Sequence, residues 1–376
     1  MERPTSAADL RQNNRNRIYR YLYDATEAVT KQDVARALNL SLPTVSTNLS
    51  ELMEEKLLSY GEPMASTGGR KPRSISVLAG ARFAAGISVS DIELRFVAID
   101  LKFNELAFEK TALRFSDTDA YYGEVAALFE AFLDKNSLSR QELIGVGVTI
   151  PGVVRPDTDL VEFAPTLSIQ NATPSGIRSY LKYPSILIND ASASGFAEWQ
   201  HHGGTANMVY LSIERGVGGA ILTDGVNYSG DHYRSGEFGH MCIAPGGLLC
   251  RCGRRGCLEA YCSTSMISDR LGLSLDEFFN RLDSGDPELA KIWDVYLRHL
   301  AQGIVSIRAA LDCDVILGGM LTAYITKERL AVLQELVGSM DPFGSDGRYV
   351  RLARFASKSA CVGAAMHYIT EFVNTI

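Results

Sequence analysis

Residues 240–257 read HMCIAPGGLLCRCGRRGC, a glycine-rich stretch that gathers one histidine and three cysteines. These four side chains are His240, Cys250, Cys252 and Cys257. Zinc takes imidazole nitrogen and thiolate sulfur as tetrahedral ligands, and a site with four protein ligands leaves no position for a reacting water. The stretch therefore predicts a structural zinc ion that shapes a loop. The alternative is a loop of reduced cysteines without metal, although the glycines supply the tight turns that chelation needs.

The chain around this stretch has 376 residues, enough for two or three domains with complete hydrophobic cores. It contains seven cysteines, no apolar signal segment at the N-terminus and no apolar run of about 18 residues. These features predict a soluble protein of the reducing cytoplasm without a membrane segment. The net charge of −7 gives no overall sign of nucleic-acid binding, but residues 1–75 carry 11 Lys/Arg against 9 Asp/Glu, and the remainder carries 26 against 35. A mildly basic head thus precedes an acidic body.

The first 60 residues contain three helical patterns. Apolar side chains recur at helical spacing in residues 18–25, Thr30 with Asp33 begins a second helix, and Ser41 caps a third. The third helix has a polar face of short hydroxyl and amide side chains, which can approach a DNA groove and bond to phosphates and base edges. We expect DNA contacts from Thr44, Ser46, Thr47 and Asn48. The spacing is that of a helix-turn-helix, although a small helical bundle remains the alternative.

A hairpin is predicted after the third helix, because Leu57, Leu58 and Tyr60 lead into a polar loop and residues 74–78 return as an alternating strand. The loop carries three cations on a glycine-rich tip, which can follow phosphates or enter a narrow minor groove. They are Arg70, Lys71 and Arg73. A solvated basic linker is the alternative for the loop alone. Together, the three helices and the basic hairpin predict a winged helix-turn-helix DNA-binding domain over residues 1–80.

The pattern changes to α/β from Arg82 onward. Residues 85–108 and 209–230 resemble each other, since each contains a glycine-bearing hairpin followed by a turn, and this likeness indicates an internal duplication. Further strands are predicted at 145–150, 185–188 and 314–317, and a long amphipathic helix at about 289–311. We therefore expect two α/β lobes around a cleft. The first would cover residues 81–195, completed by a C-terminal helix at 360–376, and the second would cover residues 196–359.

Five short motifs follow one another along this body. They are IPG at 150–152, NDA at 189–191, GEFGH at 236–240, the cysteine stretch continuing into Leu258-Glu259, and LGG at 317–319. In this order they resemble the ROK family of repressors, open reading frames and sugar kinases, and with the winged head the likeness covers nearly the whole chain. The GEFGH and cysteine motifs are highly specific, whereas each of the others is weak alone. The resemblance implies a two-lobed actin-like fold, of the sugar kinase and ribonuclease H-like kind, and zinc at the histidine and three cysteines above.

The resemblance also implies a sugar-binding cleft. Family members that bind sugars hold the hydroxyl groups with residues that correspond here to Asn189, Asp190, Glu237, His240 and Glu259. Carboxylates accept hydroxyl protons and an amide both donates and accepts, which suits neighbouring hydroxyl groups. A histidine can place one ring nitrogen on zinc and the other on a hydroxyl. Three of the five contacts flank or belong to the cysteine stretch, so we expect the metal to position them.

The two loops that hold ATP phosphates in the family's kinases are altered in this chain. The Asp-x-Gly-Gly-Thr pattern of the first is replaced by residues 88–92, SVSDI, and the Gly-Thr-Gly of the second by residues 214–216, ERG. Asp91 and Glu214 thus put carboxylates where a polyphosphate would lie, and Arg215 offsets part of their charge. Each unit-charge pair at about 4 Å repels by roughly 1 kcal/mol in water and about 4 kcal/mol at an effective dielectric constant of 20. We therefore expect no enzyme activity, with Asp190, the general-base position of the kinases, serving only as a hydrogen-bond acceptor.

These features predict a sugar-responsive transcriptional regulator, a repressor, whose partners are operator DNA and a sugar or sugar derivative. Paired winged heads read two half-sites, so a homodimer or homotetramer is expected. Two alternatives stay open. One is an active ROK sugar kinase that carries a DNA-binding head, and the other is a regulator that answers to a protein partner instead of a sugar.

Overall fold

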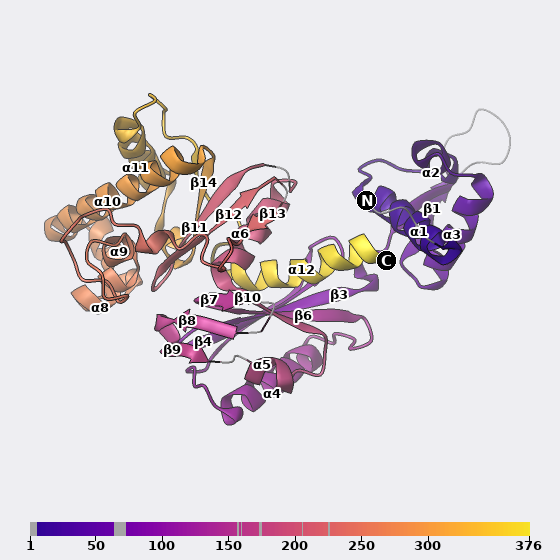
Figure 1. Ribbon diagram of the computed structural model, residues 1–376, viewed down its shortest axis with the longest axis horizontal. Coiled ribbons are helices and arrows are strands. Elements are labelled where there is room, and N and C mark those ends of the chain that lie inside the picture. The colour runs from indigo at the N-terminus through magenta and orange to yellow at the C-terminus, as the bar shows by residue number, and fades with distance from the viewer. Residues whose placement is uncertain are drawn as a thin grey trace.

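The computed structural model describes residues 6–63, 73–155, 158, 160–172, 175–204, 206–224 and 226–376. The chain forms a small helical head and two α/β lobes (Figure 1). Within the described residues, no helix is long and apolar enough to cross a membrane.

The head contains three helices and a hairpin. The helices are α1 (Ala7–Asp24), α2 (Lys31–Leu38) and α3 (Leu42–Glu54), and the strands are β1 (Leu58–Pro63) and β2 (Arg73–Val77). Thr30 and Asp33 form the expected capping box of α2, and Ser41 caps α3 by accepting a hydrogen bond from the Thr44 amide. The two strands pair antiparallel. The predicted three-helix pattern and hairpin are confirmed.

The first lobe is built on a five-stranded sheet in the order β10-β6-β3-β4-β5. These strands are β3 (Phe83–Val89), β4 (Glu93–Asp100), β5 (Glu105–Ala112), β6 (Leu143–Ile150) and β10 (Ser185–Asn189). Helices α4 (Asp119–Lys135) and α5 (Ser175–Tyr180) lie on one side of the sheet. Phe129 and Phe132 of α4 are buried against Phe96 of β4. A separate sheet follows β6 and contains β7 (Val153–Arg155), β8 (Leu160–Ala164) and β9 (Ile169–Ala172).

The second lobe repeats the topology of the first. Its sheet has the order β13-β12-β11-β14-β15, with strands β11 (Met208–Ile213), β12 (Val217–Thr223), β13 (Val226–Tyr228), β14 (Asp314–Gly318) and β15 (Val350–Leu352). In both lobes the first three strands form an antiparallel meander and the last two add in parallel. The duplication expected from residues 85–108 and 209–230 is therefore present in the fold.

Helices cover the outer face of the second sheet and fill the rest of this lobe. They are α7 (Glu259–Cys262), α8 (Ser265–Leu271), α9 (Leu275–Asp283), α10 (Pro287–Leu311) and α11 (Lys327–Met340). The predicted amphipathic helix is α10, which buries Trp293, Leu300 and Ile304 in the core of the lobe. Short 3-10 turns complete the described chain at Ala79–Ala81, Pro165–Leu167, Phe238–His240, Met320–Tyr324 and Ala356–Lys358.

Two helices cross between the lobes. Helix α6 (Asp190–His201) follows β10 of the first sheet but packs on β11 and β12 of the second. Helix α12 (Ser359–Thr375) follows β15 of the second sheet but packs on β3, β4 and β6 of the first. The helices touch closely, since a Cβ atom at Gly363 would lie 1.8 Å from the carbonyl oxygen of Ala193. A domain boundary at residue 195 would cut α6, so we place the division at the start of this helix.

The head rests on the first lobe through α1 and α12. The ring of Tyr19 meets that of Phe372 edge-on at 6.5 Å, and the Gln12 side-chain amide donates to the Ile376 carbonyl at 2.6 Å. The Tyr23 hydroxyl donates to the Leu101 carbonyl at the end of β4. Buried residues of the head and of α12 belong to one hydrophobic cluster. Figure 1 shows α12 running from the junction of the lobes to the head.

Candidate functional site

A cavity of about 410 Å³ lies between the two lobes. The first lobe contributes the β3–β4 turn and the IPG segment, and the second contributes the β11–β12 turn and the GEFGH segment. All five residues expected to bind sugar line this cavity, namely Asn189, Asp190, Glu237, His240 and Glu259. Residues that are up to 70 positions apart in the sequence therefore meet at one site.

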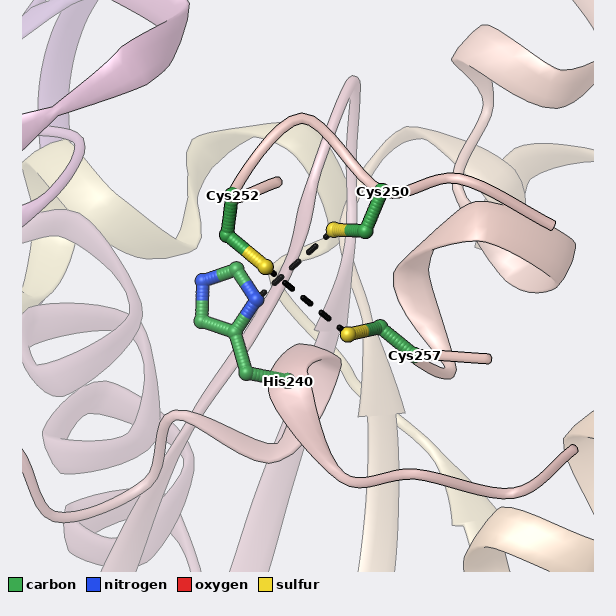
Figure 2. A group of neighbouring side chains, drawn as sticks. All are labelled: His240, Cys250, Cys252 and Cys257. Atoms are coloured by element: carbon green, nitrogen blue, oxygen red, sulfur yellow. Dashed lines mark hydrogen bonds between the residues drawn. The ribbon is translucent and has the colours of Figure 1, made fainter. Parts of the chain in front are cut away.

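The predicted metal ligands form a compact group next to the cavity (Figure 2). The ligand atoms of His240, Cys250, Cys252 and Cys257 all lie within 4.8 Å of one another. The Sγ atoms of Cys252 and Cys257 are 3.8 Å apart, and Cys250 Sγ lies 3.9 Å from Nδ1 of His240. Zinc–sulfur bonds of about 2.3 Å in a tetrahedron put two sulfurs about 3.8 Å apart. This group could hold a metal ion, and its donor atoms and spacing fit zinc.

The metal group is connected to the second sheet by Glu259. One carboxylate oxygen of Glu259 accepts a hydrogen bond from the Val217 amide of β12 at 3.0 Å, and the other lies 3.6 Å from Cys250 Sγ. The GEFGH segment also approaches β12, since a Cβ atom at Gly239 would lie 2.0 Å from the Val217 carbonyl oxygen. The loop that carries the predicted metal ligands therefore packs directly against β12 in the wall of the cavity.

His240 faces both the metal group and the cavity. Its Nδ1 atom points toward Cys250, whereas its Nε2 atom lies 3.8 Å from a carboxylate oxygen of Glu237. The ring therefore has the orientation in which one nitrogen binds a metal and the other meets a ligand. Burial raises the pKa of the Glu237 carboxyl to about 7, and the nearby charges of Asp190 and Glu259 add to this rise.

Asn189 and Asp190 lie where β10 ends and α6 begins. Asn189 is the N-cap of α6, because its side-chain oxygen accepts from the Ser192 amide at 2.7 Å. Its amide nitrogen donates to the Gly152 carbonyl at 2.8 Å, which joins α6 to the IPG segment. Asp190 accepts a hydrogen bond from the Ala191 amide at 2.8 Å, and burial raises the pKa of its carboxyl to about 6. Asn189 is therefore a structural cap as well as a cavity residue.

The two altered loops meet across the cleft through an ion pair. Arg215 of the β11–β12 turn lies 3.3 Å from Asp91 of the β3–β4 turn and 3.1 Å from Asp269 of α8. Asp269 also pairs at 2.8 Å with Arg251, which stands between two metal-ligand cysteines. Arg215 thus pairs directly with Asp91, while no ion pair of Glu214 occurs in the described part of the chain. Asp269 and Arg251 were missed from the sequence, because nothing in their spacing shows that they meet.

Arg95 is a cavity residue that the sequence motifs did not indicate. It lies on β4, where its Nη2 atom is 2.6 Å from the Glu93 carboxylate and its Nη1 atom donates to the Ser357 carbonyl at 2.7 Å. Only the alternation of β4, which turns every second side chain to the same face, could have suggested this position. The positive charge that Arg95 adds to the cavity is therefore neutralised by the Glu93 carboxylate.

The expected DNA-contact residues of α3 do not all lie on one accessible face. Thr47 is exposed, and Thr44 and Ser46 are partly exposed. Asn48 is only 4% exposed, and its amide donates to the Thr44 carbonyl at 2.8 Å, so its placement as a groove contact is wrong. The reason is helical geometry, because Asn48 shares the buried face with Val45 and Leu52.

Of the three cations expected to contact DNA from the hairpin, the structure describes Arg73. Arg73 lies on β2, donates to the Gly61 carbonyl at 3.0 Å and stacks 5.2 Å from the Tyr60 ring centre. Arg70 and Lys71 lie outside the described residues. Arg73 is thus held against the hairpin, and the prediction for the loop tip stands on the sequence alone.

Known proteins share this arrangement. The ROK family model matches residues 85–370. The DNA-binding transcriptional dual regulator NagC of Escherichia coli K12 is 26% identical over 269 residues, which are 70% of this chain and 65% of that protein, just under two thirds of its length. The crystal structure of a ROK family transcriptional regulator, a homolog of the E. coli MLC protein, has a TM-score of 0.78 and 20% identity and covers 97% of both chains.

A kinase structure is also similar, over a shorter part of the chain. The ROK hexokinase of Thermus thermophilus has a TM-score of 0.63 and 22% identity, and it covers 77% of this chain and 99% of its own. The two-lobed actin-like fold expected from the sequence is confirmed. Since the family model spans most of the chain, and residues of the IPG, NDA and GEFGH motifs line the cavity, this protein belongs to the ROK family.

Proposed function

We propose that this chain is a sugar-responsive DNA-binding transcriptional repressor that has no kinase activity. The main support is the composition of the cavity. It contains all five residues that bind sugar hydroxyl groups in the family, whereas the two loops that would hold ATP phosphates carry carboxylates. One of these, Asp91, is tied into an ion pair that joins the lobes. A sugar therefore finds its hydrogen-bond partners, whereas ATP phosphates meet negative charge and no close glycine backbone in the first loop.

The head supports the regulator over the kinase. The similar regulator structure covers nearly this whole chain, whereas the similar hexokinase structure covers 77% of it. In a winged helix-turn-helix domain, the second helix of the motif lies in the major groove of DNA. In this chain that helix is α3. We propose DNA contacts from Thr44, Ser46 and Thr47 on α3 and from Arg73 on β2, and we keep the sequence-based prediction of contacts from Arg70 and Lys71. Two such heads in a homodimer or homotetramer would read paired half-sites.

We further propose that the metal group holds a structural zinc ion. His240, Cys250, Cys252 and Cys257 would be its ligands, and the ion would fix the loop without taking part in chemistry. Through Glu259 and His240 the loop then holds two cavity side chains in place. The carboxylate of Glu259 also ties this loop to β12.

Helix α12 offers a path from the cleft to the head. Its first half packs against α6, whose N-terminus carries Asn189 and Asp190, and its last turns pack against α1. Closure of the lobes on a sugar would change the α6–α12 contact and thereby the position of the head. A sugar shifts DNA binding only if its affinity differs between the two arrangements.

A sugar kinase with a DNA-binding head is the second candidate. The observation that favours it is the Asp190 carboxyl, which stands in the cavity at the position that acts as general base in the family's kinases. A coupled assay of ATP consumption with a panel of monosaccharides separates the two. Sugar-dependent turnover at ordinary kinase rates, about 1–100 per second, would overturn the proposal.

Selection of bound fragments from genomic DNA tests the DNA-binding half of the proposal. We expect the purified chain to retain specific fragments at moderate salt. An Arg70→Ala variant should bind them more weakly and with a shallower salt dependence, because each phosphate contact contributes to the salt slope. A chain that retains no specific fragment contradicts the proposed function.

A further inference from the structure

Glu214 occupies a fixed position at the end of β11. Its amide donates to the Gly216 carbonyl at 2.9 Å, and its own carbonyl accepts from the Thr264 amide at 2.8 Å. Its side chain lines the cavity, near Asp190 at the start of α6. The backbone of Glu214 is thus fixed at the cavity wall.

The cations that line the cavity are already paired with other carboxylates. Arg95 lies 2.6 Å from Glu93, and Arg215 lies 3.3 Å from Asp91. No ion pair joins Glu214 or Asp190 to a cation within the described ranges of the chain. Glu214 has a hydrogen bond from the Met320 backbone, and Asp190 has one from Ala191. The cavity therefore has unpaired acidic groups and no spare positive charge.

The titration of Glu214 agrees with this charge balance. Burial raises the pKa of its carboxyl to about 7, the charge of Arg95 opposes the rise, and Asp190 and Glu93 add to it. A phosphate needs cations or converging N–H donors. Above this pKa the Glu214 carboxylate is ionised, and a phosphate would meet its negative charge instead of a cation.

We propose that Glu214 is a specificity-determining residue that makes the cleft accept sugars without a phosphate group and exclude their phosphate esters. This inference rests on the proposed function, since it concerns the same cavity. Hydroxyl groups can donate to the Asp190 carboxylate, whereas a phosphate dianion offers only acceptors and would bring further negative charge next to Glu214. The effector is then the sugar before its phosphorylation, not the product of a kinase.

Isothermal titration calorimetry of the full chain with matched sugar pairs, at pH 8 where the Glu214 carboxyl is ionised, tests this inference. The probes are glucose with glucose 6-phosphate and N-acetylglucosamine with N-acetylglucosamine 6-phosphate. For the pair that binds, we expect the free sugar to bind at least about 100-fold more tightly than its phosphate, as charge repulsion of this kind allows. In Glu214→Gln the ratio should fall at least about tenfold, while the dissociation constant of the free sugar changes less than about threefold.

Asp276→Asn is the matched control. Asp276 lines the same cavity, but its carboxylate already accepts a hydrogen bond from the Tyr324 hydroxyl at 2.7 Å, and we expect an unchanged ratio. Glu214→Gly provides a second variant, since glycine is the family's residue in this loop, and thermal unfolding checks that each variant is folded.

Three outcomes would overturn the inference. A phosphate ester that binds the native chain as tightly as the free sugar contradicts it directly. A ratio that stays unchanged in both Glu214 variants removes Glu214 as the cause. If no member of either pair, and no sugar of a wider thermal-shift panel, binds the native chain, the proposed function itself fails and the specificity fails with it.

Discussion

Two groups of residues that line the interlobe cavity are held in different ways. In the first group, Asn189 caps α6 and is followed by Asp190, Glu259 bonds to the Val217 amide, and His240 belongs to the metal group, so the side chains that would meet a sugar also hold the fold together. In the second group, residues 90–92 and 214–216 form the turns between the antiparallel strand pairs β3–β4 and β11–β12. Turns of this kind can lose a phosphate site without loss of the sheets. A kinase-like cleft can in this way keep a sugar site while its phosphate loops change.

The largest effect is expected from the metal ligands. Cys250→Ser or Cys252→Ser should lose zinc and, because the loop positions His240 and Glu259, weaken sugar binding by at least about 100-fold. Metal analysis and calorimetry on the same samples measure both. Cys242→Ser is the matched control, since Cys242 is an exposed thiol of the same loop outside the ligand group. Loss of zinc with unaltered sugar binding would mean that the metal group stabilises only its own loop and does not position His240 and Glu259.

A smaller effect is expected when one carboxylate of each group is changed. Asp190→Asn should weaken sugar binding by about 10- to 100-fold, the usual loss for a hydrogen bond to a charged group. Asp91→Asn, in the second group, should change sugar binding less than about threefold, because Asp91 is engaged by Arg215. Calorimetry with the same sugar gives both values. Equal losses would show that the two groups of residues do not differ in this way.

The pH dependence of unfolding should differ between the native chain and Glu214→Gln. The native state holds its proton on Glu214 up to a pKa of about 7, whereas the unfolded chain loses it near the ordinary value of 4.5. The native chain should therefore lose stability relative to the variant as pH rises from about 4.5 to 7, by an amount on the order of 2 kcal/mol. Thermal or denaturant unfolding between pH 4 and 8 measures this. Parallel profiles would mean that Glu214 is not buried as described.

The smallest effect is expected for Arg215→Ala. The side chains of Arg215, Asp91 and Asp269 are 35%, 27% and 45% exposed, so their ion pairs should contribute about 1 kcal/mol or less to stability. The unfolding midpoint should fall slightly at low salt, and the difference should vanish near 1 M salt. A fall in the unfolding midpoint as large as that measured for Cys250→Ser would show that the two altered turns contribute to the stability of the fold.

Much of the fold could be predicted from local patterns. The caps at Thr30 and Ser41, the repeated hairpins and the face of α10 each depend on residues that are neighbours in the sequence. The ordered motifs also identified the five cavity residues and the four side chains that gather in the metal group, because the geometry of such sites restricts both residue type and spacing.

The remaining features depend on contacts that no spacing encodes. The crossing of α6 and α12 follows from packing between distant segments, and the pairing of Arg215 with Asp91 joins two lobes. Asn48 was misplaced although a signal existed. It follows Val45 by three residues and precedes Leu52 by four, which puts it on the buried side of α3.

We propose that sugar in the cleft controls DNA binding by the head without any phosphoryl transfer. Fluorescence anisotropy of a labelled operator fragment, with the purified chain and no ATP, measures this coupling. We predict that a sugar which binds the cleft changes the DNA dissociation constant by at least about fivefold, the lower end of usual allosteric coupling. A sugar that binds the cleft and leaves DNA affinity unchanged would show that the cleft does not control the head.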